Sequence, residues 1–306
     1  MSRVAWISHA ECLEHEMGYG HPECPARLRA IEEHLAAVGI APRLLRLQAP
    51  RATRADLLRV HTRGLVEAIL DEPVTGYRRI DPDTAMNAHT AEAALRAAGA
   101  ALLAVDTVRA GTADLAFCAV RPPGHHAGRD KAMGFCFFNN LAVGIAHALA
   151  SGVGRVAVLD FDVHFGNGTA EIFRDDPRVL VCNTYEWPYY PFAQSDPHNG
   201  HLLDVPLPAG SDGQEFRTAV EHCWWPAVEA HAPELLFVSA GFDAHVADPL
   251  AGLCFGVPDY AWIGAQIKDM AARHCGGRVV ATLEGGYDLN ALGQSVAAFL
   301  QAFLDD

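Results

Sequence analysis

The sequence predicts an α/β protein built on a mainly parallel sheet with helices on both faces. Short apolar runs alternate along the chain with amphipathic stretches of helical period, which is the order typical of βαβ units. Polar residues follow most of the apolar runs, as they do where ligands bind at the carboxyl ends of parallel strands. The 306 residues are 50% hydrophobic and contain no low-complexity or linker-like stretch, so we expect one domain spanning residues 1–306.

The expected strands are short runs rich in Val, Ile, Leu and Phe, which favour a buried strand. In chain order they are residues 4–7, 115–120, 156–160, 179–183, 235–239 and 279–283. The expected helices are longer stretches whose apolar residues recur with a period near 3.6. In chain order they are residues 25–38, 88–109, 141–151, 215–231, 259–274 and 289–304.

Five of these strands are followed by loops that carry chemically active side chains. The loops read RPPGHHAG after Val120, DFDVHFGNG after Leu159, NTYEWPYYP after Cys182, SAGFDAHVADPLAG after Val238 and EGGYDL after Leu283. Their glycines and prolines hold side chains on fixed turns. Because the carboxyl ends of parallel strands lie at one edge of a sheet, we expect these loops to build one site.

The loop that ends the third expected strand predicts a metal site. Asp160, Asp162 and His164 stand at alternate positions, which lie on one side of an extended chain. Carboxylates at the end of a buried strand are costly to desolvate unless a cation neutralises them. A catalytic zinc site typically has three protein ligands and one position for water. Candidates for the remaining ligand are Asp243, His245 and Asp248. For any single acid, capping of a helix or pairing with arginine is the alternative explanation.

Several other chemistries lack their motifs. The chain has no GxSxG serine elbow and no HExxH zincin motif. The glycines of SGVGRVAVLD precede a strand, whereas dinucleotide binding needs them after one. His9, His15 and His21 follow no metal-ligand spacing, so we expect them not to bind a metal.

The composition argues against nucleic-acid and membrane partners. The net charge is −14, from 37 acidic and 23 basic residues, and an acidic surface repels phosphate while mildly favouring cationic substrates. We find no signal-peptide-like start and no apolar run of membrane-spanning length, so we expect a cytoplasmic protein. The eight cysteines form no CxxC pair, so we expect buried free thiols. Association into a homo-oligomer stays open.

The loop motifs together resemble the signature blocks of the zinc-dependent histone deacetylases, a superfamily that includes acetylpolyamine amidohydrolases and acetoin-utilisation proteins. The matching blocks are HPECPARLRAI (21–31), RPPGHH (121–126), GFCFFNN (134–140), DFDVHFGNG (160–168), SAGFDAHVADP (239–249) and EGGYDL (284–289). EGGY and the asparagine of GNG are more similar to the class II branch. Phe165 and residues 183–192 depart from the family's usual sequence. The resemblance implies an arginase–deacetylase fold with an eight-stranded, mainly parallel sheet.

The resemblance also implies the cofactors. One catalytic Zn²⁺ would be bound by Asp162, His164 and Asp248. A structural K⁺ would be bound by Asp160 and Asn183, together with the main-chain carbonyls of Asp162 and His164.

Amide hydrolysis needs a base for the attacking water, a donor for the oxyanion and an acid for the leaving amine. Following the resemblance, we expect His126 to act as the base and later as the acid, with Asn167 as its partner. His125, held by Asp160, would stay cationic and stabilise negative charge. Tyr287 would donate its hydroxyl to the oxyanion.

The expected substrate channel has aromatic walls. We expect its members to be Phe135, Tyr190, Leu250, Gly286 and, at the rim, Asp81 or Asp83. Leu250 directly follows the DP dipeptide, where a polyamine-specific relative is expected to carry an acid. An acyl-lysine or small acyl-amine substrate is therefore favoured over an acetylpolyamine. The further alternatives are an arginase-type ureohydrolase with two manganese ions and a binding module with an inactive site.

Overall fold

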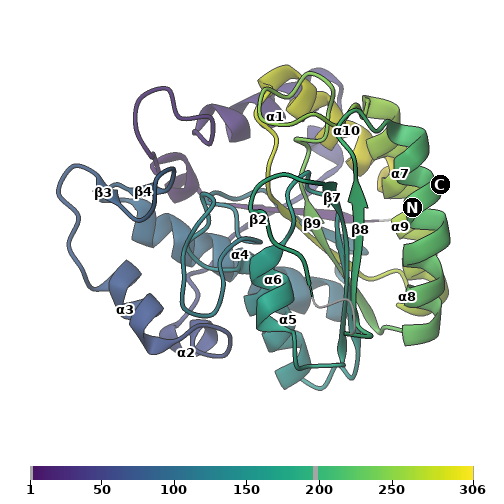
Figure 1. The fold of residues 1–306 in the computed structure, drawn as a ribbon, viewed down its shortest axis with the longest axis horizontal. Helices are drawn as coiled ribbons and strands as arrows, with labels where there is room; N and C mark the ends of the chain where they lie inside the picture. Colours follow the sequence, from purple (N-terminus) through teal and green to yellow (C-terminus); the bar gives the residue numbers. More distant parts are fainter. Residues whose placement is uncertain (1–2, 196–198, 306) are drawn as a thin grey trace.

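A computed structural model describes residues 3–195 and 199–305. Its centre is a parallel sheet flanked by helices (Figure 1). The sheet has eight strands in the order β2-β1-β5-β10-β9-β6-β7-β8, and all neighbouring strands are parallel. The strands of this sheet are β1 (Val4–Ser8), β2 (Leu45–Gln48), β5 (Leu115–Cys118), β6 (Val156–Asp160), β7 (Val179–Glu186), β8 (Leu202–Leu207), β9 (Leu235–Ala240) and β10 (Val279–Leu283). A separate antiparallel hairpin is formed by β3 (Arg78–Arg79) and β4 (Ala85–Met86). The predicted parallel sheet is confirmed.

Helices cover both faces of this sheet (Figure 1). On one face, α4 (Thr90–Arg109) and α5 (Asn140–Ala150) pack against each other and against central strands. On the other face, α10 (Leu289–Leu304) packs between α1 (Ala26–Ala37) and α9 (Val257–His274). The shorter helical segments are η1 (Ala10–Leu13), η2 (Ala41–Arg43), α2 (Arg54–Leu57), α3 (Arg63–Leu70), α6 (Asn167–Ile172), α7 (Gly213–Ala219), η3 (Val220–Trp224) and α8 (Trp225–His231).

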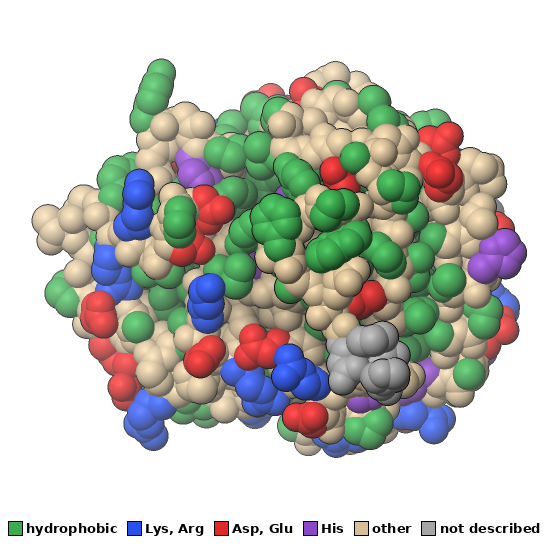
Figure 2. All heavy atoms as spheres, in the orientation of Figure 1, with side chains coloured by type: hydrophobic (Ala, Val, Ile, Leu, Met, Phe, Trp, Pro, Cys, Tyr) green, Lys and Arg blue, Asp and Glu red, His purple; other side chains and the backbone are tan. Residues whose placement is uncertain are grey.

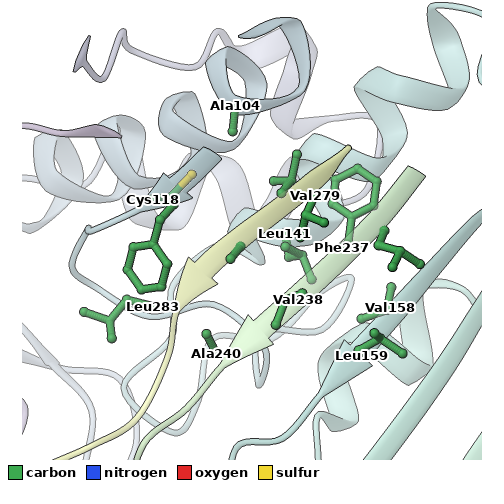
Figure 3. Close-up of a cluster of buried hydrophobic side chains, with 14 of the residues drawn as sticks. Ala104, Cys118, Leu141, Val158, Leu159, Phe237, Val238, Ala240, Val279 and Leu283 are labelled. Carbon is green, nitrogen blue, oxygen red and sulfur yellow. The ribbon is translucent and has the colours of Figure 1, made fainter. Parts of the chain in front are cut away.

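The central strands are continuous apolar runs because helices bury both of their faces. Every residue of β5, β6, β9 and β10 is buried. Figure 3 shows side chains of these strands packed with Ala104 of α4 and Leu141 of α5. In a sheet covered on both sides, neither face of a strand needs polar residues. This core holds the carboxyl ends of the strands in fixed positions at one edge.

The sequence does not predict β2 and β8, which lie at the two edges of the sheet. Most residues of β2 are exposed, and β8 contains Pro206, which has no N–H to donate to a neighbouring strand. An edge strand has one neighbour and is partly exposed, so it need not carry a continuous apolar run. The pattern that identifies the central strands is therefore absent from these two.

The helix expected at residues 215–231 is divided into three segments. A π-helical segment, η3, separates α7 from α8, and α8 begins with Pro226 in its first turn. Proline has no backbone N–H, and its ring clashes with the carbonyl of the preceding turn of an α-helix. The wider π-helical turn accommodates this local break.

All eight cysteines are free thiols, and five of them are buried. This agrees with the absence of CxxC pairs in the sequence. Within residues 3–195 and 199–305, no helix combines the length and hydrophobicity needed to cross a bilayer.

Candidate active site

The loops after β6 and β9 bring two carboxylates and one imidazole together. Asp162 and His164 follow β6, and Asp243 follows β9. Nδ1 of His164 lies 3.0 Å from Oδ1 of Asp162 and 3.3 Å from Oδ2 of Asp243. One ligand atom from each residue lies within 4.8 Å of the other two. In the described part of the chain, no other group of three His, Cys, Asp or Glu side chains converges in this way.

This cluster fits a divalent metal ion. Asp162 and Asp243 are both 1% exposed, and Oδ2 of Asp243 accepts no hydrogen bond from any described residue. Adjacent buried carboxylates are unfavourable without a neutralising cation. Gly285 closes the site, since a Cβ there would lie 1.9 Å from Oδ2 of Asp243 and 2.7 Å from Oδ2 of Asp162. Two carboxylates and an imidazole are ligands that zinc accepts, with a coordination position left over.

Asp248 lies outside this cluster, which contains Asp243 instead. The expectation that Asp248 is the third metal ligand is therefore corrected: Asp243 takes that place. Oδ2 of Asp248 accepts the backbone N–H groups of Tyr287 and Asp288, and Oδ1 accepts that of Leu250. Backbone donors from two loops therefore engage both carboxylate oxygens. Asp243 and Asp248 belong to the same loop, and their spacing in the sequence does not indicate which of them turns toward His164.

Asp160 and Asn183 lie opposite one another on the adjacent strands β6 and β7. Both are 1% exposed, and Oδ1 of Asn183 accepts no hydrogen bond from the residues that the structure describes. A Cβ on Gly166 would lie 2.3 Å from Oδ2 of Asp160 and 3.1 Å from Oδ1 of Asn183. A buried oxygen without a donor, beside a carboxylate, suits a bound cation.

The loop after β5 presents two histidines with opposite electrostatic properties. Nδ1 of His125 lies 3.1 Å from Oδ2 of Asp160, and Nδ1 of His126 lies 2.7 Å from Oδ1 of Asn167. Burial alone would lower the pKa of His125, but the carboxylates of Asp162 and Asp160 raise it to about 10. Burial, together with the charges of His125 and His164, holds the pKa of His126 well below its ordinary value. These opposite pKa shifts favour the cationic form of His125 and the neutral form of His126 at neutral pH.

Tyr287 follows β10 and lines the same cavity as both histidines. The Arg27 guanidinium lies over its ring at 4.9 Å from the centroid, and Phe135 meets it edge-to-face at 5.9 Å. Burial raises the pKa of the Tyr287 hydroxyl well above its ordinary value, although Arg27 opposes this shift. The hydroxyl therefore stays protonated and can donate a hydrogen bond.

The cavity above His164 has a volume of about 220 Å³. Its walls include Phe135 and Tyr190, and Leu250 and Asp83 also line it. These four predicted channel residues are thus brought together. Tyr189, which the sequence did not single out, also lines the cavity, and its ring stacks on His164 with centroids 5.7 Å apart.

Two other predicted channel residues have different positions. Asp81 does not line the cavity; its Oδ1 accepts the N–H groups of Asp83 and Thr84 and so holds the turn between β3 and β4. Gly286 is also absent from the lining, and its carbonyl accepts a hydrogen bond from Nε of Arg27 at 2.6 Å. Each supports a loop that carries a lining residue.

Phe165, which departs from the family's usual histidine, does not line this cavity. It is 2% exposed and packs against Tyr185, with ring centroids 4.9 Å apart. Its role in the structure is therefore apolar packing, directly after His164 in the segment between β6 and α6.

A buried charge cluster behind the Tyr287 loop was not identified from the sequence. Glu23, Arg27 and Arg121 are all fully buried. Arg121 donates to Oε2 of Glu23 at 2.7 Å, and Arg27 donates to Oε1 of Glu23 at 3.3 Å. Arg27 also donates to the carbonyl of Glu284 at 2.5 Å. The cluster thus fixes the strand end from which the Tyr287 loop departs.

Glu284 also supports the loop after β5 that carries His125 and His126, a role that the sequence did not suggest. Its Oε2 accepts the backbone N–H groups of Gly124 at 2.7 Å and His125 at 3.1 Å. The only signal in the sequence was the position of Glu284 in EGGYDL, because its partners lie far away along the chain.

Known proteins resemble this chain over almost its full length. Residues 21–303 match the family described as the histone deacetylase domain. The chain is 36% identical over 291 residues to a probable deacetylase of Archaeoglobus fulgidus, covering 92% of this chain and 81% of that protein. It is 40% identical over 276 residues to a histone deacetylase-like amidohydrolase of Pseudomonas aeruginosa, covering 88% of this chain and 73% of that protein.

The fold has a close structural relative. A crystal structure of the HDA15 HD domain superposes with a TM-score of 0.92 at 34% identity, covering 99% of this chain and 88% of that one. The superposition and the parallel eight-stranded sheet confirm the predicted arginase–deacetylase fold. With the family match over residues 21–303, they show that this chain belongs to the histone deacetylase family of deacetylases and amidohydrolases.

Proposed function

We propose that this protein is a zinc-dependent amidohydrolase that removes acyl groups from acyl-lysine side chains or small acyl amines. One observation carries the proposal: Asp162, His164 and Asp243 form a metal-binding cluster, and His164 lines the same cavity as Tyr287 and His126. Metal ligands, a base and an oxyanion donor around one cavity are what amide hydrolysis requires.

Zn²⁺ would be held by Asp162, His164 and Asp243. When bound, the ion supplies Lewis acidity to the amide carbonyl and to the attacking water. The same ligand set argues against an arginase-type site with two manganese ions, which would need a further group of carboxylates. We extend the proposal to a K⁺ ion beside Asp160 and Asn183, supported by Oδ1 of Asn183, which has no hydrogen-bond partner among the described residues.

The chain's own side chains would manage the protons and charges of the reaction. Since Oδ1 of Asn167 accepts from Nδ1 of His126, the Nε2 atom of His126 is free to take a proton from water. His126 would then deliver that proton to the leaving amine. The Tyr287 hydroxyl would donate to the developing oxyanion, and the positive charge of His125 would stabilise it further.

The cavity's lining favours an extended acyl-amine chain. Phe135 and Tyr190 provide aromatic walls, and Leu250 adds an apolar contact. The net charge of −14 is a weak guide to the substrate, because acidic and basic side chains are interspersed on the face seen in Figure 2. Fields of exposed charges are screened beyond about 8–10 Å in physiological salt, so local contacts select the substrate.

Acetylpolyamine deacetylation is a second candidate, favoured by one observation. The Asp83 carboxylate lines the cavity and could pair with a second ammonium group on the substrate. It could equally accept an N–H group from a peptide backbone. The side chain that lines the cavity at Leu250 offers no charge, and we therefore retain the acyl-lysine or small acyl-amine class as the first choice.

Replacing Tyr287 with Phe tests the mechanism. We expect Tyr287→Phe to keep its bound metal and to lose about 10²–10³-fold in kcat, the effect typical of removing one oxyanion donor. Steady-state hydrolysis of an acetyl-lysine peptide and metal analysis of the same preparation would measure this. Tyr185→Phe is the matched control, because Tyr185 does not line the cavity. Full turnover by Tyr287→Phe would refute the proposed role.

The substrate class is tested by comparing kcat/KM for acetyl-lysine peptides, longer acyl-lysines, acetylated putrescine and spermidine, and an uncharged acyl amide. We expect the acyl-lysine peptides to be preferred. In Asp83→Asn, kcat/KM for the acetylpolyamines should fall about fivefold while the uncharged amide is unaffected, because a partly exposed ion pair contributes up to about 1 kcal/mol. A hundredfold preference of the unmodified protein for an acetylpolyamine would overturn the substrate choice.

A further inference from the structure

The carboxylate of Asp248 joins two loops that each contribute a residue to the cavity lining, Leu250 from one and Tyr287 from the other. Its Oδ2 accepts the N–H groups of Tyr287 at 2.6 Å and Asp288 at 3.2 Å. Its Oδ1 accepts the N–H group of Leu250 at 3.0 Å. Asp248 is 7% exposed, so these hydrogen bonds are largely shielded from water.

The segment that begins at Asp248 is also held on its other side. We call residues 248–252 the mouth loop. The carbonyl of Leu250 accepts the Tyr189 hydroxyl, and the N–H group of Gly252 donates to Oε2 of Glu186 at 2.6 Å. Tyr189 itself stacks on His164. The mouth loop is therefore fixed between the Tyr287 loop and the aromatic segment beside the metal cluster.

We propose that Asp248 is a positioning residue that sets the place of Tyr287 relative to the metal cluster and to the mouth loop. The inference rests on the proposed function, in which Tyr287 is the oxyanion donor. A hydroxyl stabilises an oxyanion only within a narrow range of distances and angles, so the backbone that carries it must be held. Asp248 binds the backbone N–H group of that same residue.

Asparagine at this position would disturb the arrangement in a defined way. The aspartate has two acceptor oxygens, and three backbone donors engage them. An asparagine has one acceptor oxygen and an NH₂ group that only donates. Asp248→Asn must therefore leave either the Tyr287 and Asp288 N–H groups or the Leu250 N–H group facing another donor.

The test is a double-mutant cycle between Asp248→Asn and Tyr287→Phe. We expect Asp248→Asn alone to lower kcat at least tenfold while keeping its bound metal. In the Tyr287→Phe background, the same change should lower kcat by less than about threefold, because residues that act as a unit are not additive. If the double variant shows the full product of the two single losses, Asp248 does not act through Tyr287. Loss of metal from Asp248→Asn would also overturn the proposal.

Amide hydrogen exchange gives a second reading that needs no enzymatic activity. The Tyr287 and Asp288 amides should exchange faster in Asp248→Asn than in the unmodified protein, and unchanged exchange would overturn the proposal. Asp56→Asn is the control, because Asp56 accepts the N–H group of Thr53 in a helix cap and does not line the cavity. Asp56→Asn should leave kcat and the exchange of Tyr287 unchanged. If the unmodified protein hydrolyses no acyl amide, the proposed function fails, while exchange still decides whether Asp248 holds the loop.

Discussion

Asp243→Ala is expected to contain less than about a tenth of the metal bound by the unmodified protein and to show no measurable acyl-amide hydrolysis. A site with three protein ligands cannot lose a carboxylate and retain its affinity. Without the ion, the water and the amide carbonyl both lose their activation, which costs several kcal/mol of transition-state stabilisation. Metal analysis of protein purified without added metal, followed by turnover measurements, would check both expectations.

This experiment also separates loss of a ligand from loss of the fold. In the metal-free state, Asp243 lies beside the buried carboxylate of Asp162, and like charges destabilise one another. Oδ1 of Asp243 also accepts the N–H group of Val163 at 3.0 Å, so the companion variant is Asp243→Asn, which keeps an acceptor there. Thermal unfolding of metal-free Asp243→Asn should therefore begin no earlier than that of the metal-free unmodified protein. Full metal occupancy in Asp243→Ala would contradict the assignment of the third ligand, and two manganese ions per unmodified chain would contradict the one-zinc proposal.

Glu23→Gln is expected to lower the free energy of unfolding by about 3–5 kcal/mol, which is the cost of removing one partner of a buried ion pair. Glu23 is fully buried and receives hydrogen bonds from Arg27 and Arg121. Glutamine has no negative charge, so the buried guanidinium groups of Arg27 and Arg121 lose the carboxylate that neutralises them. Chemical denaturation of the metal-loaded protein measures the change.

Glu67→Gln is the matched control, because Glu67 forms an exposed pair with Arg63. Exposed pairs of this kind contribute about 0.5 kcal/mol or less, so the control should unfold almost as the unmodified protein does. If both variants lost the same free energy of unfolding, the burial of the Glu23 ion pairs could not explain the loss in Glu23→Gln. Because Arg27 binds the carbonyls of Glu284 and Gly286, Glu23→Gln should also reduce turnover.

The same cluster predicts how stability depends on pH. Burial opposes ionisation of Glu23, but Arg121 and His15 outweigh burial and hold the pKa of Glu23 well below its ordinary value of 4.5. A carboxyl group with a lowered pKa in the folded state stabilises the fold above its unfolded pKa, and this contribution is lost as the pH falls through the folded value. The contribution of Glu23 is therefore complete at neutral pH and declines only below about pH 4.5.

The central strands and the edge of the sheet that carries the site were predictable from local patterns. Strands β5, β6, β9 and β10 are buried on both faces, so each is a continuous apolar run that stands out from its neighbours. Strands β2 and β8 lie at the edges and lack that pattern. Helix α10 was predicted at its exact bounds because its apolar stripe is long and uninterrupted, whereas the helix expected at 215–231 is broken before Pro226.

By itself, the sequence determined the family, the central sheet and the loops that meet at its carboxyl edge, because these depend on residue order and on short, local periodicities. Only the tertiary structure decided that Asp243 rather than Asp248 turns toward His164, and that Asp83 rather than Asp81 lines the cavity. It also decided that Glu284 holds the backbone of the His125 loop and that Glu23 holds Arg27 behind the Tyr287 loop. The physical reason is that a carboxylate's role depends on which donors reach it. Those donors come from residues that are distant in sequence and adjacent only in the folded chain.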